Sequence, residues 1–308
     1  MDSLIKIEGK PLEKLIDVVS NAIGTLYKPR QIEREARAEA KAETIKAIEH
    51  AKTQAILDGD LDKVQYLGTI NERLVAKEIK RQKNIENVIA VAGKVLQAEE
   101  TVSEESVNPD WATRFFDISQ DVSDEKMQNL WGQILAGEIK QPQSYSLRAL
   151  EILRNMTKEE AEIFQKVAQF ALYQTYFFLF SPNKVLEKLE VPYYNIAKLI
   201  EIGLLQSGDF ASMNFDNKEN EKIEFLYGDF ALVVNFISKQ EVRKISFPIK
   251  LFTTAGEELL QLIDIIPNMN YIQEFAKAIK KDDVEVGYAE VICLENDGTI
   301  RYKDPVIL

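Results

Sequence analysis

The segment at residues 111–153 constrains the fold of this chain more than any other part, because it contains both tryptophans and three successive amphipathic helical patterns. Asn108 before Pro109 predicts where the first helix begins, since asparagine is a favoured N-cap and proline is tolerated at the first helical position. Ser123 is expected to cap the second helix. The apolar faces consist of Trp111, Phe115, Ile118 and Val122, then Met127, Leu130, Trp131, Ile134 and Leu135, then Leu147, Leu150 and Leu153.

A fourth helix follows this segment. Gly137 and Pro142 are expected to end the second helix, and Thr157 with Glu160 predicts a capping box at the start of the fourth. Four short helices with short connections predict a compact helical bundle over residues 108–180. None of these helices contains a motif for a known reaction, so the segment indicates a fold and not an active site.

Three runs in this region, WATRFF at 111–116, LWGQILAGEI at 130–139 and SLRAL at 146–150, resemble a bacterial family described only as a domain of unknown function. That family is itself similar to the abortive-infection alpha (Abi-alpha) family. The resemblance implies a bacterial, cytoplasmic protein concerned with phage defence. It implies no catalytic residues.

Residues 1–28 are predicted to form an amphipathic helix, because apolar residues recur three and four positions apart. Its apolar face consists of Leu12, Leu15, Ile16, Val19, Ile23 and Leu26. Two interpretations remain open: the face packs on the protein body or a sister subunit, or residues 12–27 contact a membrane surface. The scarcity of basic residues on the polar face weakens the membrane interpretation.

Residues 29–100 are predicted to form a long helical hairpin. The first helix, over 31–57, is rich in alanine and has five acidic and five basic side chains between Glu33 and Lys52, which favours helix formation. Asp58-Gly59-Asp60 predicts a turn, after which residues 61–100 form the second helix and fold back on the first. A projection of this length is suited to partner contacts or to oligomerisation.

A basic cluster lies on the second helix of this hairpin and is a candidate contact for an anionic partner. It consists of Lys77, Lys80, Arg81 and Lys83. Glu72, Glu78 and Glu86 interrupt the cluster, and no aromatic side chains are interleaved to stack on bases. A solvated helix face is therefore the favoured interpretation.

Residues 181–308 are predicted to form an α+β region with winged-helix-like character. Two short helices, one after Ser181-Pro182 and one from Pro192 to Gly203, precede an apolar run at 222–237 that is broken by Gly228-Asp229. Between residues 182 and 205 three lysines are balanced by three glutamates. Because a DNA-reading helix needs cationic or amide side chains, sequence-specific DNA binding is disfavoured.

The end of the chain predicts further α+β elements. A strand is expected at 246–252, and Thr254 with Glu257 predicts a capping box for the helix that follows. Another helix is expected at 271–280. Residues 284–294 and 299–302 predict a terminal hairpin.

Charge and cysteine content exclude several classes of protein. The net charge of the 308 residues is −12, and residues 1–100 hold 17 acidic and 17 basic side chains, so the later residues carry all of the excess. Nonspecific nucleic-acid binding through bulk charge is therefore not expected. One cysteine, Cys293, rules out an intramolecular disulfide and suits a reducing compartment. With no signal peptide and no long apolar run, a cytoplasmic protein is predicted, with membrane association as an alternative for its active state.

No catalytic, metal or cofactor site is expected. His50 is the single histidine and lies in a charged helical segment, while Cys293 lies in a predicted strand and is expected to be buried. One histidine and one cysteine cannot supply a zinc site, and no phosphate-binding glycine loop is present. Two carboxylate groups remain as candidates for a magnesium site. They are Asp110, Asp117, Asp121 and Asp124, and Asp282, Asp283 and Glu285.

These patterns together predict an α+β, predominantly helical protein. A long N-terminal helical hairpin and a central helical bundle precede a smaller α+β region with winged-helix-like character. The leading hypothesis is a non-enzymatic interaction or assembly protein, an abortive-infection-like effector that acts through its N-terminal helix on a partner or a membrane. A homo-oligomer or a protein partner is expected. The alternatives are a winged-helix nucleic-acid-binding regulator and a carboxylate-based, metal-dependent nuclease.

Overall fold

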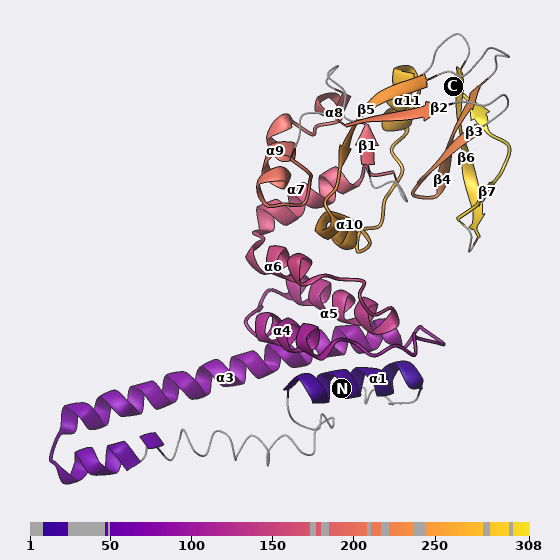
Figure 1. Ribbon diagram of the computed structural model, residues 1–308. Helices are drawn as coiled ribbons and strands as arrows, with labels where there is room; N and C mark the ends of the chain where they lie inside the picture. Colours follow the sequence, from indigo (N-terminus) through magenta and orange to yellow (C-terminus); the bar gives the residue numbers. More distant parts are fainter. Residues whose placement is uncertain are drawn as a thin grey trace. The chain divides into compact units, whose positions relative to one another are not determined.

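The computed structural model describes residues 9–23, 47–48, 50–172, 177–179, 185–207, 211–216, 222–236, 244–279, 284–295 and 298–308. The chain is α+β and predominantly helical, as the sequence predicts (Figure 1). It divides into two compact units, Met1–Leu150 and Glu151–Leu308.

Unit 1 is a helical bundle. Its helices are α1 (Lys10–Ile23), α3 (Leu61–Leu96), α4 (Pro109–Ser119), α5 (Glu125–Lys140) and the first residues of α6 (Leu147–Asn155). Helix α3 packs along α5, and α1 packs chiefly on α4. The predicted N-cap of α4 is confirmed, since the Asn108 side chain accepts hydrogen bonds from the backbone N–H groups of Asp110 and Trp111 at 2.8 and 3.2 Å.

The composition of this bundle differs from the prediction. The sequence separates the N-terminal helix and the hairpin from a four-helix bundle at 108–180, whereas α1 and the C-terminal half of α3 pack with α4 and α5. Helix α7 (Lys158–Ala168) lies in unit 2, where it packs on α9 (Tyr193–Glu201). Helical periodicity shows that a face is apolar without showing which other face covers it.

Aromatic side chains fill the centre of unit 1. The Phe115 ring stacks on Trp111 at 5.1 Å between centroids and meets Trp131 edge-on at 5.2 Å. Trp131 is fully buried, and the indole N–H of Trp111 donates to the carbonyl oxygen of Tyr145 at 2.7 Å. The two tryptophans thus organise this core, as their position in the sequence suggests.

Two glycines of α5 allow its neighbours to approach closely. A Cβ atom at Gly132 would lie 2.5 Å from Cβ of Val91 on α3, and one at Gly137 would lie 2.8 Å from the Tyr145 ring. Gly137 therefore does not end the helix as predicted, since α5 continues to Lys140. Its N-cap is also corrected: the Asp124 carboxylate, one residue after the predicted Ser123, accepts from the backbone N–H of Met127.

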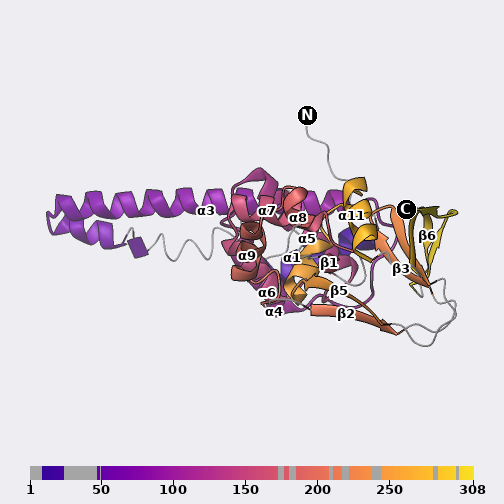
Figure 2. The ribbon, with the colours of Figure 1, turned by 90° about the horizontal axis from the view of Figure 1, so that it is seen from above.

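The N-terminal half of α3 projects from unit 1 (Figures 1 and 2). We call residues 61–83 the arm; none of them is buried, whereas the next residue, Asn84, begins the buried part of α3. Residues 50–57 are helical and lie beside the arm in both views, and Gly59, at φ 71°, makes the predicted turn. The Asp60 side chain caps α3 by accepting from the Lys63 N–H.

Unit 2 contains a three-stranded antiparallel sheet preceded and interrupted by helices. In chain order the elements are α7, β1 (Phe177–Leu179), α8 (Val185–Lys188), α9, β2 (Ala211–Asp216) and β5 (Lys244–Leu251). The strand order is β1-β5-β2. Strand β1 lies within the range 108–180 that the sequence assigns to the helical bundle, and β5 begins two residues before the predicted strand at 246–252.

A second antiparallel sheet completes unit 2. Its strands are β3 (Lys222–Tyr227), β4 (Phe230–Phe236), β6 (Val284–Leu294), β7 (Ile300–Tyr302) and β8 (Val306–Ile307). The order is β3-β4-β6-β7, with β8 also paired to β6. The run at 222–237, which the sequence assigns to the winged-helix-like module, therefore forms β3 and β4 of this other sheet. Both edges of β4 are occupied, by β3 and β6, so it does not extend the first sheet.

Two helices contribute to the core of unit 2, α10 (Thr254–Leu260) and α11 (Met269–Ile279). The cap of α10 is Thr253, whose hydroxyl accepts from the Gly256 N–H at 3.1 Å, in place of the predicted box at Thr254 and Glu257. The buried Tyr271 of α11 meets the rings of Phe170 and Tyr227 edge-on. Burial raises the pKa of the Tyr227 hydroxyl to about 12.

The capping box of α7 is confirmed and also links α7 to α9. The Glu160 carboxylate accepts from the Thr157 N–H at 2.8 Å, and it lies 3.7 Å from the Lys198 ammonium. The backbone hydrogen bond from Thr157 is the main cause that holds the pKa of Glu160 below its ordinary value of 4.5.

We predict that Gly132→Ala destabilises the protein by about 1–3 kcal/mol, because the added methyl group overpacks the contact between α3 and α5. Gly68→Ala is the matched control on α3, since a Cβ there meets no atom within 4 Å. It is expected to stabilise the helix by about 0.5–1 kcal/mol. Urea unfolding measures both effects, and equal stability of the two variants would contradict the close packing.

We also predict that Glu160→Gln removes an acid-sensitive part of the stability. Because the folded-state pKa of Glu160 is below 4.5, the unfolded chain binds more protons just below pH 4.5, and this contribution is lost as pH falls through the folded pKa. The free energy of unfolding of the wild type should exceed that of the variant by about 0.3–1 kcal/mol at pH 7, because the carboxylate charge in the first turn of α7 interacts favourably with the helix dipole. In urea unfolding at pH 7, 5, 4 and 3, a difference that does not shrink below pH 4.5 would contradict this assignment.

Candidate functional site

The predicted contact face of the N-terminal helix lies inside unit 1. Leu12, Leu15 and Val19 are buried, with Val19 completely inaccessible, and Ile16 and Ile23 are half-buried. Leu26 lies outside the described residues. The structure thus shows this face packed on the protein body. A later role of the same face in binding a partner or membrane stays a prediction.

Lys14 fastens α1 to the rest of unit 1. Its ammonium group donates to three backbone carbonyl oxygens, those of Ser103, Glu105 and Ile139, at 3.0, 2.6 and 3.1 Å. Burial lowers the pKa of Lys14, and the nearby charge of Glu104 opposes this shift. These bonds join α1 to the segment before α4 and to the C-terminal end of α5, where a cation is favoured by the helix dipole.

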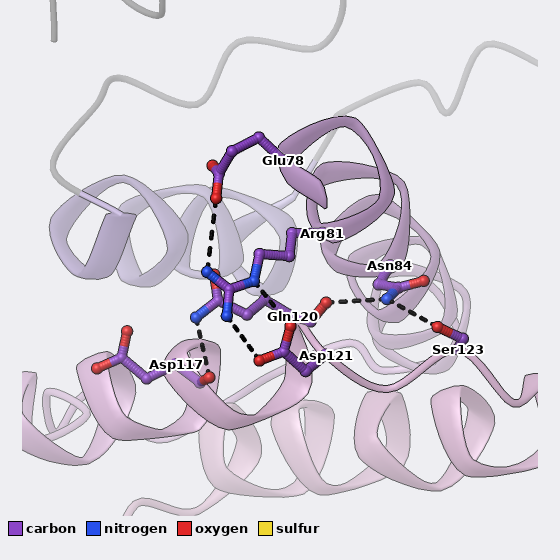
Figure 3. Close-up of polar contacts among 7 residues, drawn as sticks. All are labelled: Glu78, Arg81, Asn84, Asp117, Gln120, Asp121 and Ser123. Carbon is purple, nitrogen blue, oxygen red and sulfur yellow. Dashed lines mark hydrogen bonds and ion pairs between the residues drawn. The ribbon is translucent and has the colours of Figure 1, made fainter. Parts of the chain in front are cut away.

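The predicted basic cluster divides into one paired and three exposed members. The Arg81 guanidinium forms two hydrogen bonds of 2.7 Å with the Asp121 carboxylate and lies 3.5 Å from Glu78 (Figure 3). Lys77, Lys80 and Lys83 are exposed. Arg81 is therefore paired at the base of the arm, and contact of the four residues with an anionic partner stays a prediction.

A polar network lies next to this ion pair, at the start of the buried part of α3. The Asn84 amide donates to the Gln120 carbonyl oxygen at 2.8 Å and to the Ser123 hydroxyl at 3.3 Å (Figure 3). Its own oxygen accepts from Gln128 of α5 at 3.0 Å. Asn84 and Gln128 are both 5% exposed. Sequence analysis missed these residues, although an asparagine within an apolar stripe is a signal for a position-specifying contact.

The arm exposes several large apolar side chains. Of the sixteen exposed large hydrophobic side chains in the described part of the chain, five lie on the arm: Leu61, Tyr66, Leu74, Val75 and Ile79. Two more, Ile56 and Leu57, lie on the helical segment before it. Sequence analysis noted the basic residues of this helix but missed its apolar ones, because they lie on more than one face. The arm also contains six basic and three acidic residues, a net charge of +3 in a chain of −12.

The exposed surface of α9 is different in character. Tyr193 and Tyr194 in its first turn are about three-fifths exposed. The neighbouring cations are paired: Lys198 lies near Glu160 and Glu201, and Lys188 lies 3.4 Å from Glu274. Paired lysines are poorly suited to phosphate binding, so this surface favours a protein contact over a nucleic-acid contact.

Several of the residues considered for catalysis are exposed or have other roles. His50 is exposed, and Cys293 is exposed near the end of β6, which corrects the expectation of a buried thiol. Asp121 pairs with Arg81, and Asp124 caps α5. Asp282 and Asp283 lie outside the described residues. Among those described, no three His, Cys, Asp or Glu side chains are grouped as metal ligands would be.

The described helices give no sign of a membrane span, because none combines sufficient length with sufficient apolar character. Residues 69–276, about two thirds of the 308, match one family model, described as a protein of unknown function (DUF2806). Neither the curated proteins nor the solved structures gave a match. The matched range begins in the arm and includes the Arg81 and Asn84 contacts.

We predict that Asn84→Ala destabilises the protein more than Arg81→Ala. Loss of the buried amide leaves polar groups of Gln120 and Gln128 without this partner. The free energy of unfolding should fall by about 1–3 kcal/mol as a result. The Arg81 pair is partly exposed and contributes about 1 kcal/mol or less. Urea unfolding of both variants measures the difference, and raised salt should weaken the Arg81 contribution selectively. The reverse ranking would contradict the structural role assigned to the network.

Proposed function

The chain belongs to this family of proteins of unknown function, and we propose that it is a non-enzymatic interaction protein that binds a partner protein through the arm of α3. One observation carries the proposal: the arm projects from unit 1 while exposing Leu61, Tyr66 and Ile79 by 76, 67 and 65%. Exposed apolar side chains concentrated on one projecting element support a protein contact site.

The physical argument begins with the stability of a projecting helix. A helix with no packed face is only marginally stable in water, because most helical stability in proteins comes from burial of an apolar face. The arm has no buried residue of its own, and the helical segment at 50–57 lies beside only one side of it. Binding a partner would bury the remaining apolar side chains and stabilise the arm.

The base of the arm is fixed, which suits a contact surface. Arg81 and Asn84 both bind the connection between α4 and α5, at the point where α3 enters the bundle (Figure 3). The two-bond Arg81–Asp121 contact restricts rotation of the helix. A surface that is already oriented loses less conformational freedom when it binds.

The arm is better placed for this role than α1. An effector role for the face containing Leu12, Leu15 and Val19 requires α1 to leave α4 and to break the three hydrogen bonds of Lys14. The arm is accessible without such a change. We retain phage defence as the proposed biological setting, because the runs between Trp111 and Leu150 resemble a family of unknown function that is itself similar to the Abi-alpha family.

A second candidate function is supported by the connectivity of unit 2. A winged helix has the element order helix, strand, helix, helix, strand, strand. Unit 2 has this order from α7 to β5 when β3 and β4 are set aside, and its first sheet has the strand order β1-β5-β2 that a winged helix requires. The β3–β4 hairpin is inserted where the wing of such a module would be. A nucleic-acid-binding regulator of this type would show a mobility shift that survives competitor DNA at about 0.15 M salt.

We predict that a photo-reactive amino acid at position 79 gives a discrete cross-linked product in bacterial cells that express the full chain. Ile79 is 65% exposed on the arm, so a bound partner would lie within reach of the probe. Position 292 is the matched control, because Ile292 is also 65% exposed but lies in unit 2. Equal labelling from both positions, or none from position 79, would contradict the arm as the contact surface.

The phage-defence setting is tested separately with Ile79→Glu and the control Ile292→Glu. Plating efficiency of a phage panel should fall on cells that express the wild-type chain or the control, and should recover with the arm variant. Protection by all three proteins would support defence but remove the arm from it. No protection by any expressed and folded version would reject the defence setting.

A further inference from the structure

We propose that two copies of the chain pair through their arms, side by side and antiparallel, with the two-fold axis next to Ile70. This inference rests on the proposed function, because it assigns a second copy as the partner of the arm. It follows from two sequence-symmetric patterns on one exposed helix, one apolar and one charged.

The apolar pattern is a stripe centred on Ile70. Tyr66, Ile70 and Leu74 are four residues apart, so they lie on one face of α3. Tyr66 is 67% exposed, Leu74 is 37% exposed and Ile70 is half-buried. In an antiparallel pair centred on Ile70, Tyr66 of each copy meets Leu74 of the other. The two Ile70 side chains meet at the axis, so each copy uses the same stripe, as a two-fold interface requires.

The charged pattern has the same centre. Asp62 precedes Ile70 by eight residues, and Lys77 and Lys80 follow it by seven and ten. Asp62 and Lys80 project from the same side of the helix, because their separation of eighteen positions corresponds to about five full turns. All three are exposed. Antiparallel pairing therefore brings Asp62 of each copy close to Lys77 and Lys80 of the other, at both ends of the contact. Lys63 and Glu78 lie in the same register and offset part of this attraction. Residues 60–63 nevertheless carry a net charge of −1 (Asp60, Asp62 and Lys63), and residues 77–80 a net charge of +1 (Lys77, Glu78 and Lys80).

Opposite charges at the two ends of the arm favour a second copy over other partners. A parallel pair would place Asp62 on Asp62 and Lys80 on Lys80, and like charges in direct contact are unfavourable. A second copy in antiparallel orientation instead places the net negative segment at 60–63 against the net positive segment at 77–80, with the apolar stripe between them.

We predict that charge reversal disrupts this pair and that mixing complementary variants restores it. In sedimentation velocity on the full chain, Asp62→Lys and the double variant Lys77→Glu/Lys80→Glu should each raise the dimer dissociation constant by about tenfold or more. An equimolar mixture of the two should form a dimer again, because opposite charges then meet at both ends. Asp229→Lys, an exposed reversal in unit 2, is the control and should leave the constant unchanged.

Cysteine cross-linking tests the orientation. In a Cys293→Ser background, which removes the single native cysteine, Ile70→Cys should oxidise to a disulfide-linked dimer. Tyr66→Cys and Leu74→Cys should cross-link when mixed and remain uncoupled alone, because a disulfide needs Cα atoms within about 7 Å. Efficient self-coupling of Tyr66→Cys would indicate parallel pairing and overturn the proposal.

Two outcomes separate this inference from the function on which it rests. If the full chain stays monomeric up to about 0.1 mM, pairing is overturned. If position 79 still cross-links another protein in cells, the arm remains a contact surface. A dimer that none of the charge reversals weakens overturns pairing through the arm. If position 79 also fails to cross-link, the proposed function fails with it.

Discussion

The close contact between α3 and α5 is the constraint on which unit 1 depends. Gly132 leaves no space for a side chain between α5 and the Val88–Val91 turn of α3, so the two backbones approach closely and the apolar faces on either side interlock. Interiors packed at this density tolerate little change in volume. The contact fixes the C-terminal half of α3, and through it the direction in which the other half leaves the bundle.

Polar groups then determine where burial of α3 ends. The Asn84–Gln128 network satisfies buried amides at the last layer of the core, and the Arg81–Asp121 pair follows one turn nearer the arm. Because unpaired buried polar groups are costly, such contacts specify one alignment of the helices more strictly than apolar packing does. One helix thus serves as core at one end and as an exposed surface at the other, which is the basis of the proposed function.

In unit 2, two strands lie between β2 and β5 in the sequence but belong to a second sheet. The strands β1, β5 and β2 form one sheet, while the segment between β2 and β5 provides β3 and β4 to a second sheet with β6. β4 is paired on both sides, by β3 and β6, and β3 lies at the edge of the sheet. The lysines beside α9 are likewise paired with carboxylates. Lysines paired in this way are poorly suited to phosphate contacts.

The sequence alone determined the helical segments, the turn at Gly59, the caps at Asn108 and Thr157, and the terminal strands, because these depend on local backbone preferences and on periodicity within one element. It located the caps of α5 and α10 one residue away from their true positions, Asp124 and Thr253. Only the tertiary structure decided that α1 and α3 share a core with α4 and α5, that Arg81 is paired, and that Cys293 and the apolar residues of the arm are exposed. The physical reason is that burial and pairing depend on which surfaces meet, and residues as distant as Arg81 and Asp121 leave no local signal of their contact.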